Sequence, residues 1–282
     1  MSIRASISQQ TIQEAVAALG GIARNKDLLA RGYSTRQVSE AVAEGVIHRI
    51  ARGYYALAEA SETEVFLAAH QARRTCLSKA ADLGLWVLEE PKQLHVAAAH
   101  GRPIPGCVVH RVKGGQKLMD ILRQCVRCGT ELEALAVLES AVVTNKCSIN
   151  YLRTSFSGRQ DQAGRAIVEL IDPQAMSLPE TCGRYHLRKA GYNVQGQAYV
   201  RNAGHIDLLV DGVLGVEIDG QEFHNNSKAW REDLRRDTMY VVQGMWRLRV
   251  PAAIAMYQPD ILLRWVEQAL ARIRSTQRPQ MQ

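Results

Sequence analysis

Three acidic side chains and one histidine gather in a short stretch near the C-terminus of the chain. Asp207 interrupts one apolar run, Glu217 and Asp219 interrupt the next, and His224 follows. Charges cost free energy on a sheet that packs against helices, so acids on adjacent strands need either solvent or a cation. A hairpin with one solvated face would explain Glu217 and Asp219, but it explains Asp207 and His224 less well. The stretch therefore favours a cation site over a solvated hairpin.

The hairpin that carries these acids is indicated by Asp211-Gly212, which separates the two apolar runs. A two-residue loop would place Asp207 opposite Val216 and leave Glu217 on the other face. A three-residue loop, residues 211–213, would instead pair Asp207 with Glu217 on one face of the sheet. A metal site therefore requires the longer loop or a bulge.

The N-terminal part of the chain reads as three short helices followed by a hairpin. Residues 11–14 and 34–37 fit capping boxes, in which two side chains satisfy the free amides at a helix start. Gly45 suits the left-handed position that ends a helix, and residues 46–50 and 54–57 read as short strands around a turn. This order predicts a winged helix-turn-helix.

The third helix of such a module would enter the major groove of double-stranded DNA and present polar side chains to the bases. These side chains are Thr35, Arg36, Gln37 and Ser39. Arg49 and Arg52 on the wing suit contacts with phosphates. Winged helices also serve as protein-interaction or scaffolding modules, but basic residues on both the helix and the wing favour DNA.

Part of this segment resembles a known family. Residues 20–29 and 52–57 look like the N-terminal domain of the AbiEi-type antitoxins of type IV toxin–antitoxin systems. The resemblance implies a winged helix that binds DNA and represses its own operon. It also implies a protein partner, either a cognate toxin or a second copy of the chain.

The C-terminal part looks like the PD-(D/E)XK nuclease superfamily. More closely, residues 206–210 and 216–224 are similar to the very-short-patch-repair endonucleases. Residues 177–180, 230–237 and 244–249 continue the match in order and spacing. This resemblance implies a restriction-endonuclease-like core that cleaves DNA with the help of a metal ion.

The same resemblance implies a role for each polar side chain. Asp207 would be the central ligand of Mg²⁺ or Mn²⁺, and Glu217 would be the acidic residue of the superfamily motif and the second ligand. His224 would be the general base that activates water. Glu180 and Asp237 would be auxiliary catalytic residues.

Asp219 departs from the superfamily pattern, which has a lysine two residues after the acid. A carboxylate cannot stabilise a pentacovalent phosphate as an ammonium does, so water activation would pass to His224 or to a second metal ion. This position separates two interpretations. One is a Mg²⁺-dependent endonuclease or nickase with its own DNA-recognition domain. The other is a non-catalytic repressor or antitoxin whose nuclease-like domain is degenerate.

Length and composition set outer limits on these interpretations. The chain has 282 residues, of which 46% are hydrophobic and 22% charged, and its formal net charge is +7. A basic balance favours polyanionic partners such as nucleic acid. No apolar run is long enough to cross a bilayer, and the N-terminus has no signal-peptide stretch. We therefore expect a cytoplasmic protein without membrane contacts.

The middle of the chain contains scattered cysteines and histidines. Cys125 and Cys128 form a lone C-x-x-C motif, and a zinc ion would need two further ligands. The nearest candidates are Cys107, His100 and His110. Histidines on short strands, His95 included, are more often surface or satisfied side chains than ligands. The sequence therefore favours reduced, mostly buried thiols over a zinc site.

The expected elements of this middle part are a helix over residues 62–79, strands over 93–98 and 106–112, and helices from 117 and 131. Residues 150–174 are expected to be a polar stretch that includes a loop.

The sequence predicts an α+β multidomain fold with three domains. They are a winged helix-turn-helix in residues 8–58, a small α/β connector in 59–174, and a restriction-endonuclease-like mixed α/β core in 175–276.

Overall fold

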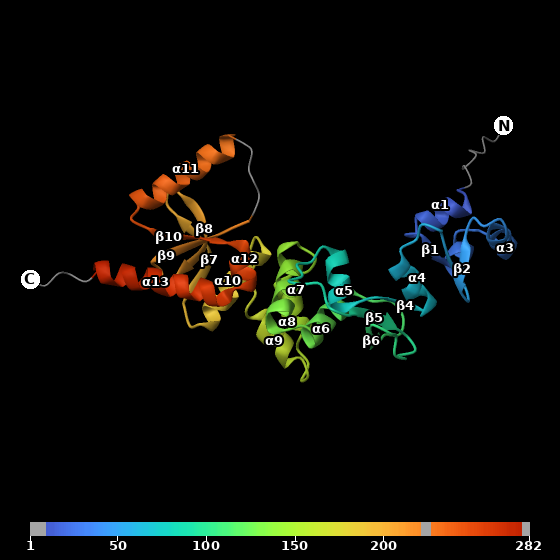
Figure 1. Cartoon of the computed structure of the whole chain (residues 1–282). Helices are drawn as coiled ribbons and strands as arrows, with labels where there is room; N and C mark the ends of the chain where they lie inside the picture. Colours follow the sequence, from blue (N-terminus) through green and yellow to red (C-terminus); the bar gives the residue numbers. More distant parts are fainter. Residues whose placement is uncertain (1–9, 221–226, 278–282) are drawn as a thin grey trace, which may run out of the picture. The chain divides into compact units, whose positions relative to one another are not determined.

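The computed structural model describes residues 10–220 and 227–277 (Figure 1). The chain divides into two compact units. The first contains Met1–Lys79 and Pro91–Gln116, and the second contains Ala80–Glu90 and Lys117–Gln282. The division into three domains remains a prediction.

The first unit begins with the helices α1 (Ile12–Ala17), α2 (Asn25–Ala30) and α3 (Thr35–Ala43). The capping boxes predicted at Thr11 and Ser34 both form, and each hydroxyl accepts the backbone N–H three residues later at 3.2 Å. Because these bonds satisfy amides that a helix leaves unpaired, they stabilise the starts of α1 and α3.

A three-stranded antiparallel sheet accompanies these helices, in the order β1-β3-β2. Its strands are β1 (Ile22–Arg24), β2 (His48–Ala51) and β3 (Tyr54–Ala56). The hairpin of β2 and β3 is confirmed, and Gly53 in its turn has a φ of +75°. β1 is absent from the sequence prediction because three residues carry too little periodicity to show a strand.

The core of this region joins all three helices to the hairpin. Val16 of α1, Leu28 of α2 and Val38 of α3 are buried together with Ile47. Because Val38 faces this core, α3 is held with its opposite face in solvent. We refer to residues 12–57 as the N-terminal module.

The helix α4 (Glu62–Ala69) packs against the sheet of the N-terminal module and is followed by β4 (Ala72–Arg74) and α5 (Cys76–Ala80). The single helix predicted over residues 62–79 is therefore wrong. The chain turns at Gln71, which has a φ of +52°, and β4 then pairs with a neighbouring strand. That pairing supplies the backbone hydrogen bonds that a continuous helix would have supplied.

β4 is the edge of a second three-stranded sheet in the first unit, in the order β4-β5-β6. β5 (Leu94–Ala98) and β6 (Cys107–Arg111) lie within one residue of their predicted bounds. β4 is antiparallel to β5, whereas β6 is parallel to it. Leu67 of α4 packs with Val96 of β5 in a small buried cluster.

The second unit begins with helices. They are the short 3₁₀ helix η1 (Ala81–Leu83), α6 (Leu118–Cys128), α7 (Glu131–Val143), α8 (Ile149–Ser155) and α9 (Gln162–Val168). α8 and α9 fall in the stretch that was expected to be polar and irregular. Phe156 is buried directly over Gly164 of α9, where an added Cβ would lie only 2.2 Å from the ring. This close approach explains the glycine inside a helix.

The rest of the second unit is a four-stranded sheet with helices on both faces (Figure 1). Its strands are β7 (Val194–Val200), β8 (Gly204–Val210), β9 (Leu214–Asp219) and β10 (Trp246–Pro251). Its helices are α10 (Leu178–Lys189), α11 (Ser227–Val242), α12 (Ala252–Tyr257) and α13 (Pro259–Gln277). We refer to residues 178–277 as the C-terminal module.

The strands of the C-terminal module follow the order β10-β9-β8-β7. β7, β8 and β9 are antiparallel neighbours, whereas β10 joins β9 in parallel after α11. Leu187 of α10 and Leu262 of α13 pack with Val216 on one face, and Tyr240 of α11 packs with Ile206 on the other. The described chain is thus a mixed α/β protein with three small sheets. Among its described helices, none has the length and apolar character needed to span a bilayer.

Candidate functional site

The N-terminal module presents the outer face of α3 to solvent. Thr35, Arg36 and Ser39 are exposed, and the Ser39 hydroxyl donates to the carbonyl of Thr35 at 3.0 Å. Arg36 is 88% exposed, and its guanidinium forms an ion pair with Glu40 at 2.8 Å. The Gln37 side-chain oxygen accepts from the backbone N–H of Ser34 at 2.8 Å, as part of the capping box. Its amide nitrogen is therefore the end that could donate to a ligand.

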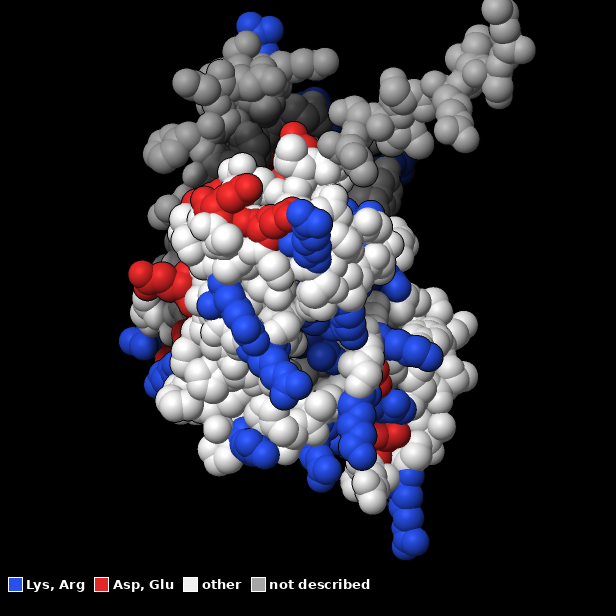
Figure 2. Space-filling view, turned by 90° about the vertical axis from the view of Figure 1, so that its right-hand side faces the viewer, with Lys and Arg blue, Asp and Glu red and all other residues white. Residues whose placement is uncertain are grey.

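The hairpin of β2 and β3 adds two positive charges to this surface. Arg49 on β2 and Arg52 in the turn are exposed, and neither has a side-chain hydrogen bond or ion pair with another described residue. Figure 2, which faces this module, shows Lys and Arg side chains spread over the surface and Asp and Glu in smaller groups, the largest of them at the upper left. Such a surface suits a polyanion.

The hairpin of β8 and β9 has the longer of the two loops considered above. Val210 pairs with Leu214 and Leu208 pairs with Val216, so the loop consists of residues 211–213. Asp207 and Glu217 are the next residues outward on the two strands. Pairing ends there, and the carboxylate of Asp207 accepts the backbone N–H of Ile218 at 2.9 Å.

Asp207 is linked to Glu180 through a glutamine. Nε2 of Gln197 donates to Glu180 at 2.8 Å and lies 3.4 Å from Oδ1 of Asp207. Glu180 is buried in the first turn of α10, where its carboxylate also accepts from the Ser177 hydroxyl at 2.8 Å. Two of the predicted site residues therefore lie in one hydrogen-bonded chain.

Glu217 and Asp237 lie in a second network, which is built around arginines. Glu217 is within 3.1 Å of both Arg236 and Arg247, and Arg247 also contacts Asp237 at 2.5 Å. Asp219 lies in neither network, because Arg249 holds it through two bonds of 2.7 and 2.8 Å. The guanidinium groups occupy carboxylate oxygens that a metal ion would need.

Burial changes the acidity of both central carboxyl groups. Desolvation raises the pKa of Asp207 even though the Ile218 amide favours its charged form. Desolvation likewise raises the pKa of Glu217, against the opposing effect of Arg247 and Arg236. Repulsion between carboxylates adds to this effect, because Glu180 raises the pKa of Asp207 and Asp207 raises the pKa of Glu217. Concentrated negative charge of this kind is common at functional sites.

The described acids of the C-terminal module do not form a group of three ligand atoms at metal-binding distance. His224, the predicted general base, lies outside the described residues. Asp207 lies close enough to Glu180 and to Glu217 for each pair of carboxylates to interact, whereas Asp219 is paired with Arg249.

Three polar side chains of this region were not among the predicted site residues. Gln197 joins Glu180 to Asp207 from β7, a strand that the sequence did not predict, and it has a φ of +47°. Arg236 and Arg247 lie within residues 230–237 and 244–249, which the resemblance covers. Their pairing with Glu217 could not be predicted, because it depends on how the folded chain places α11 and β10 beside β9.

Comparison with known proteins concerns the N-terminal module alone. Residues 10–58 match the family model described as "Transcriptional regulator, AbiEi antitoxin". This is the region to which the exposed face of α3 and the exposed arginines of the β2–β3 hairpin belong. The match covers a minority of the chain and says nothing about the C-terminal module. No curated protein matches the chain.

Proposed function

We propose that this protein is a DNA-binding transcriptional regulator of the antitoxin kind, in which residues 12–57 act as a winged helix-turn-helix. The observation that carries the proposal is the exposed face of α3 beside the exposed Arg49 and Arg52 of the hairpin. A helix supported by a buried core on one side and free on the other is suited to the major groove. The family match over residues 10–58 supports the same function.

The regulator has two kinds of contact with DNA in this proposal. Arg49 and Arg52 bind phosphates and supply affinity that does not depend on sequence. Thr35, Arg36 and Ser39 of α3 reach base edges and supply specificity. In the antitoxin interpretation, the protein partner is a toxin encoded beside this gene.

The test is DNA binding by the full chain. DNA fragments from upstream of its own gene are titrated at several salt concentrations, and affinity is measured by fluorescence anisotropy. The double variant Arg49→Ala/Arg52→Ala should bind all sequences more weakly, and the salt slope should fall by about one unit per lost phosphate contact. Lys146→Ala/Arg153→Ala is the matched control, since both residues are exposed bases of the second unit. Unchanged binding by the wing variant would contradict the proposal.

A second function, metal-dependent cleavage of DNA, is favoured by one observation. Asp207 is a partly buried carboxyl group with a raised pKa, and it lies close to Glu180 and Glu217. An acidic group kept in this state costs stability, and a bound cation would offset that cost. The arginines around Glu217 and the Arg249–Asp219 pair argue against an assembled metal site.

The two functions are separated by incubating plasmid DNA with the protein in Mg²⁺, in Mn²⁺ and in a chelator. Nicking that requires the metal ion and is lost in Asp207→Asn would establish a nuclease. Tight binding of DNA by a protein that cleaves no substrate would leave the regulator function alone.

A further inference from the structure

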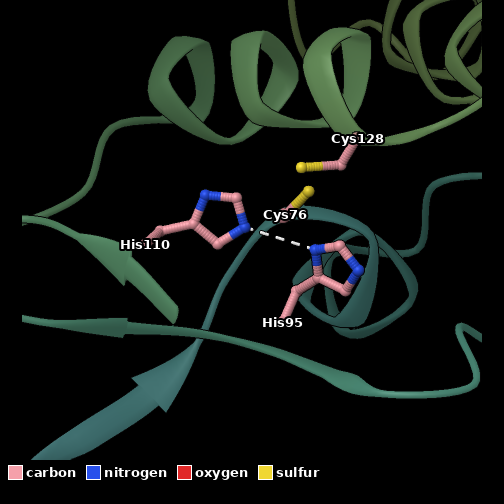
Figure 3. Close-up of side chains that lie close together, drawn as sticks. All are labelled: Cys76, His95, His110 and Cys128. Carbon is pink, nitrogen blue, oxygen red and sulfur yellow. Dashed lines mark hydrogen bonds between the residues drawn. The ribbon is translucent and has the colours of Figure 1, made fainter. Parts of the chain in front are cut away.

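Cys76, His95 and His110 bring three metal-ligating side chains together in the first unit (Figure 3). Cys76 begins α5, His95 lies on β5 and His110 lies on β6. Their ligand atoms, the Cys76 sulfur and one nitrogen of each ring, lie within 4.8 Å of one another. Since each residue comes from a different element, the folded chain creates the cluster and no local sequence motif reveals it.

The two imidazole rings have the separation that a shared metal ion requires. Nδ1 of His95 lies 3.2 Å from Nε2 of His110. With Zn–N bonds of about 2.0–2.1 Å and tetrahedral angles, two nitrogen ligands lie about 3.3 Å apart. The rings could therefore bind one ion with little movement.

Hydrogen bonds on both sides of Cys76 hold it beside His95. The backbone N–H of Thr75 donates to the His95 carbonyl at 2.9 Å, and the backbone N–H of His95 donates to the Ser78 hydroxyl at 2.9 Å. Thr75, Cys76 and Ser78 are all buried. Cys76 itself has a φ of +53°, a left-handed conformation that is strained in residues other than glycine. Such strain persists where the surrounding structure fixes a residue, and ligand sites are common examples.

One thiolate with two imidazoles gives three ligands of the kinds that zinc prefers in proteins, and all three belong to the first unit. Figure 3 also draws Cys128, which belongs to the second unit and is not counted among these ligands.

We propose that Cys76, His95 and His110 bind a zinc ion that holds α5, β5 and β6 together. Each ligand comes from a different element of the first unit, and a tetrahedral ion with three protein ligands has room for one further ligand. The sequence favoured ordinary thiols here, because it offered only the C-x-x-C of Cys125 and Cys128 and gave no reason to join Cys76 to His95.

The first test is metal analysis of the full chain purified without chelator. We expect one zinc per chain by mass spectrometry of the elements, and replacement by Co²⁺ should give the visible bands of a tetrahedral site with a thiolate-to-cobalt band. His110→Ala should lower zinc affinity by more than the roughly 10–100-fold that loss of an outer-shell partner costs. Cys76→Ser should lower affinity and weaken the thiolate band while leaving the two imidazole ligands in place.

Cys107→Ser is the matched control, because Cys107 lies on the same strand as His110 but outside the cluster. Its zinc content and cobalt spectrum should equal those of the unmodified protein. Absence of metal or unchanged affinity in His110→Ala would overturn the site. An unchanged cobalt spectrum in Cys76→Ser would overturn the thiolate ligand, and a different native metal would overturn zinc.

Discussion

Glu139 of α7 and Arg184 of α10 form an ion pair that is buried almost completely, with 0% and 2% of their side chains exposed. The Glu139 carboxylate also accepts from the Thr181 hydroxyl at 2.5 Å and from the backbone N–H of Asp172 at 2.6 Å. Asp172 adds a further carboxylate 3.9 Å from the guanidinium. These bonds compensate for removing both charges from water and connect the helices of the second unit with its C-terminal module.

Replacing Glu139 by Gln should destabilise the second unit by about 3–5 kcal/mol, because Arg184 would remain buried without its counter-charge. The double variant Glu139→Leu/Arg184→Met should lose much less, since neither charge is then buried alone. Urea unfolding followed by circular dichroism measures both. Glu169→Gln removes an ion pair with Arg153 that is mostly exposed, and it should cost less than about 1 kcal/mol. An equal loss of stability in Glu139→Gln and Glu169→Gln would contradict the conclusion that burial makes the Glu139–Arg184 pair the more important one.

Asp207→Asn should make the protein more stable at neutral pH. The folded state raises the pKa of Asp207, mainly by burial, so it binds this proton more tightly than the unfolded chain does. The contribution of Asp207 to stability therefore falls as pH rises from the ordinary carboxyl range through the raised pKa. We expect a gain in the free energy of unfolding at pH 7 that shrinks as the pH falls toward the ordinary carboxyl range of about pH 4.

Urea unfolding of Asp207→Asn and of the unmodified protein between about pH 4 and pH 7 shows whether the substitution raises or lowers the free energy of unfolding. Glu169→Gln serves again as the exposed control, with no comparable gain as the pH rises. An Asp207→Asn protein that is less stable than its parent throughout the range would show that the charged carboxylate stabilises the strand end.

If α3 binds DNA as proposed, Arg36→Ala should reduce the preference for the specific DNA site over random DNA. The difference in binding free energy between the two DNAs should fall by roughly 1–3 kcal/mol if Arg36 contacts a base. Glu40→Gln should act in the opposite direction on overall affinity, because it releases Arg36 from its ion pair and removes a charge that repels phosphates. Anisotropy titrations with specific and random DNA measure both effects. Equal loss on the two DNAs in Arg36→Ala would assign Arg36 to the backbone.

If the C-terminal module is a nuclease, Asp207→Ala and His224→Ala should fail in different ways. Loss of Asp207 removes the principal oxygen ligand and should abolish both metal binding and cleavage. Loss of His224 should leave metal affinity nearly unchanged and slow cleavage by roughly 10²–10⁴-fold, the usual effect of a general base. Calorimetric metal titration and plasmid nicking separate the two roles, and equal metal affinity in all three proteins would exclude Asp207 as a ligand.

Local signals predicted local structure well. The capping boxes at Thr11 and Ser34 and the turn at Gly53 depend on neighbours within a few residues, and all three form. The helix predicted over residues 62–79 was wrong because β4 gains its hydrogen bonds from β5, a strand that lies distant in sequence. Apolar spacing alone cannot report such a partner.

Side-chain partners in the C-terminal module were also beyond what local sequence could predict. The sequence identified Asp207 and Glu217 as unusual, and the loop alternatives it raised included the one that forms. It could not reveal that Arg236 and Arg247 surround Glu217, since pairing of charges depends on how α11 and β10 are placed. The cluster of Cys76 and His95 was missed for the same reason.

The parallel pairing of β10 with β9 affects how the chain can be shortened or synthesised. β10 comes after α11, so β9 has a bare edge until residues 246–251 have been made. That edge carries the backbone of Leu214 and Val216, whose side chains are fully apolar. Unpaired strand edges readily join those of other molecules. A prematurely terminated or truncated product ending before β10 should therefore self-associate and precipitate, even though all of its N-terminal module is present.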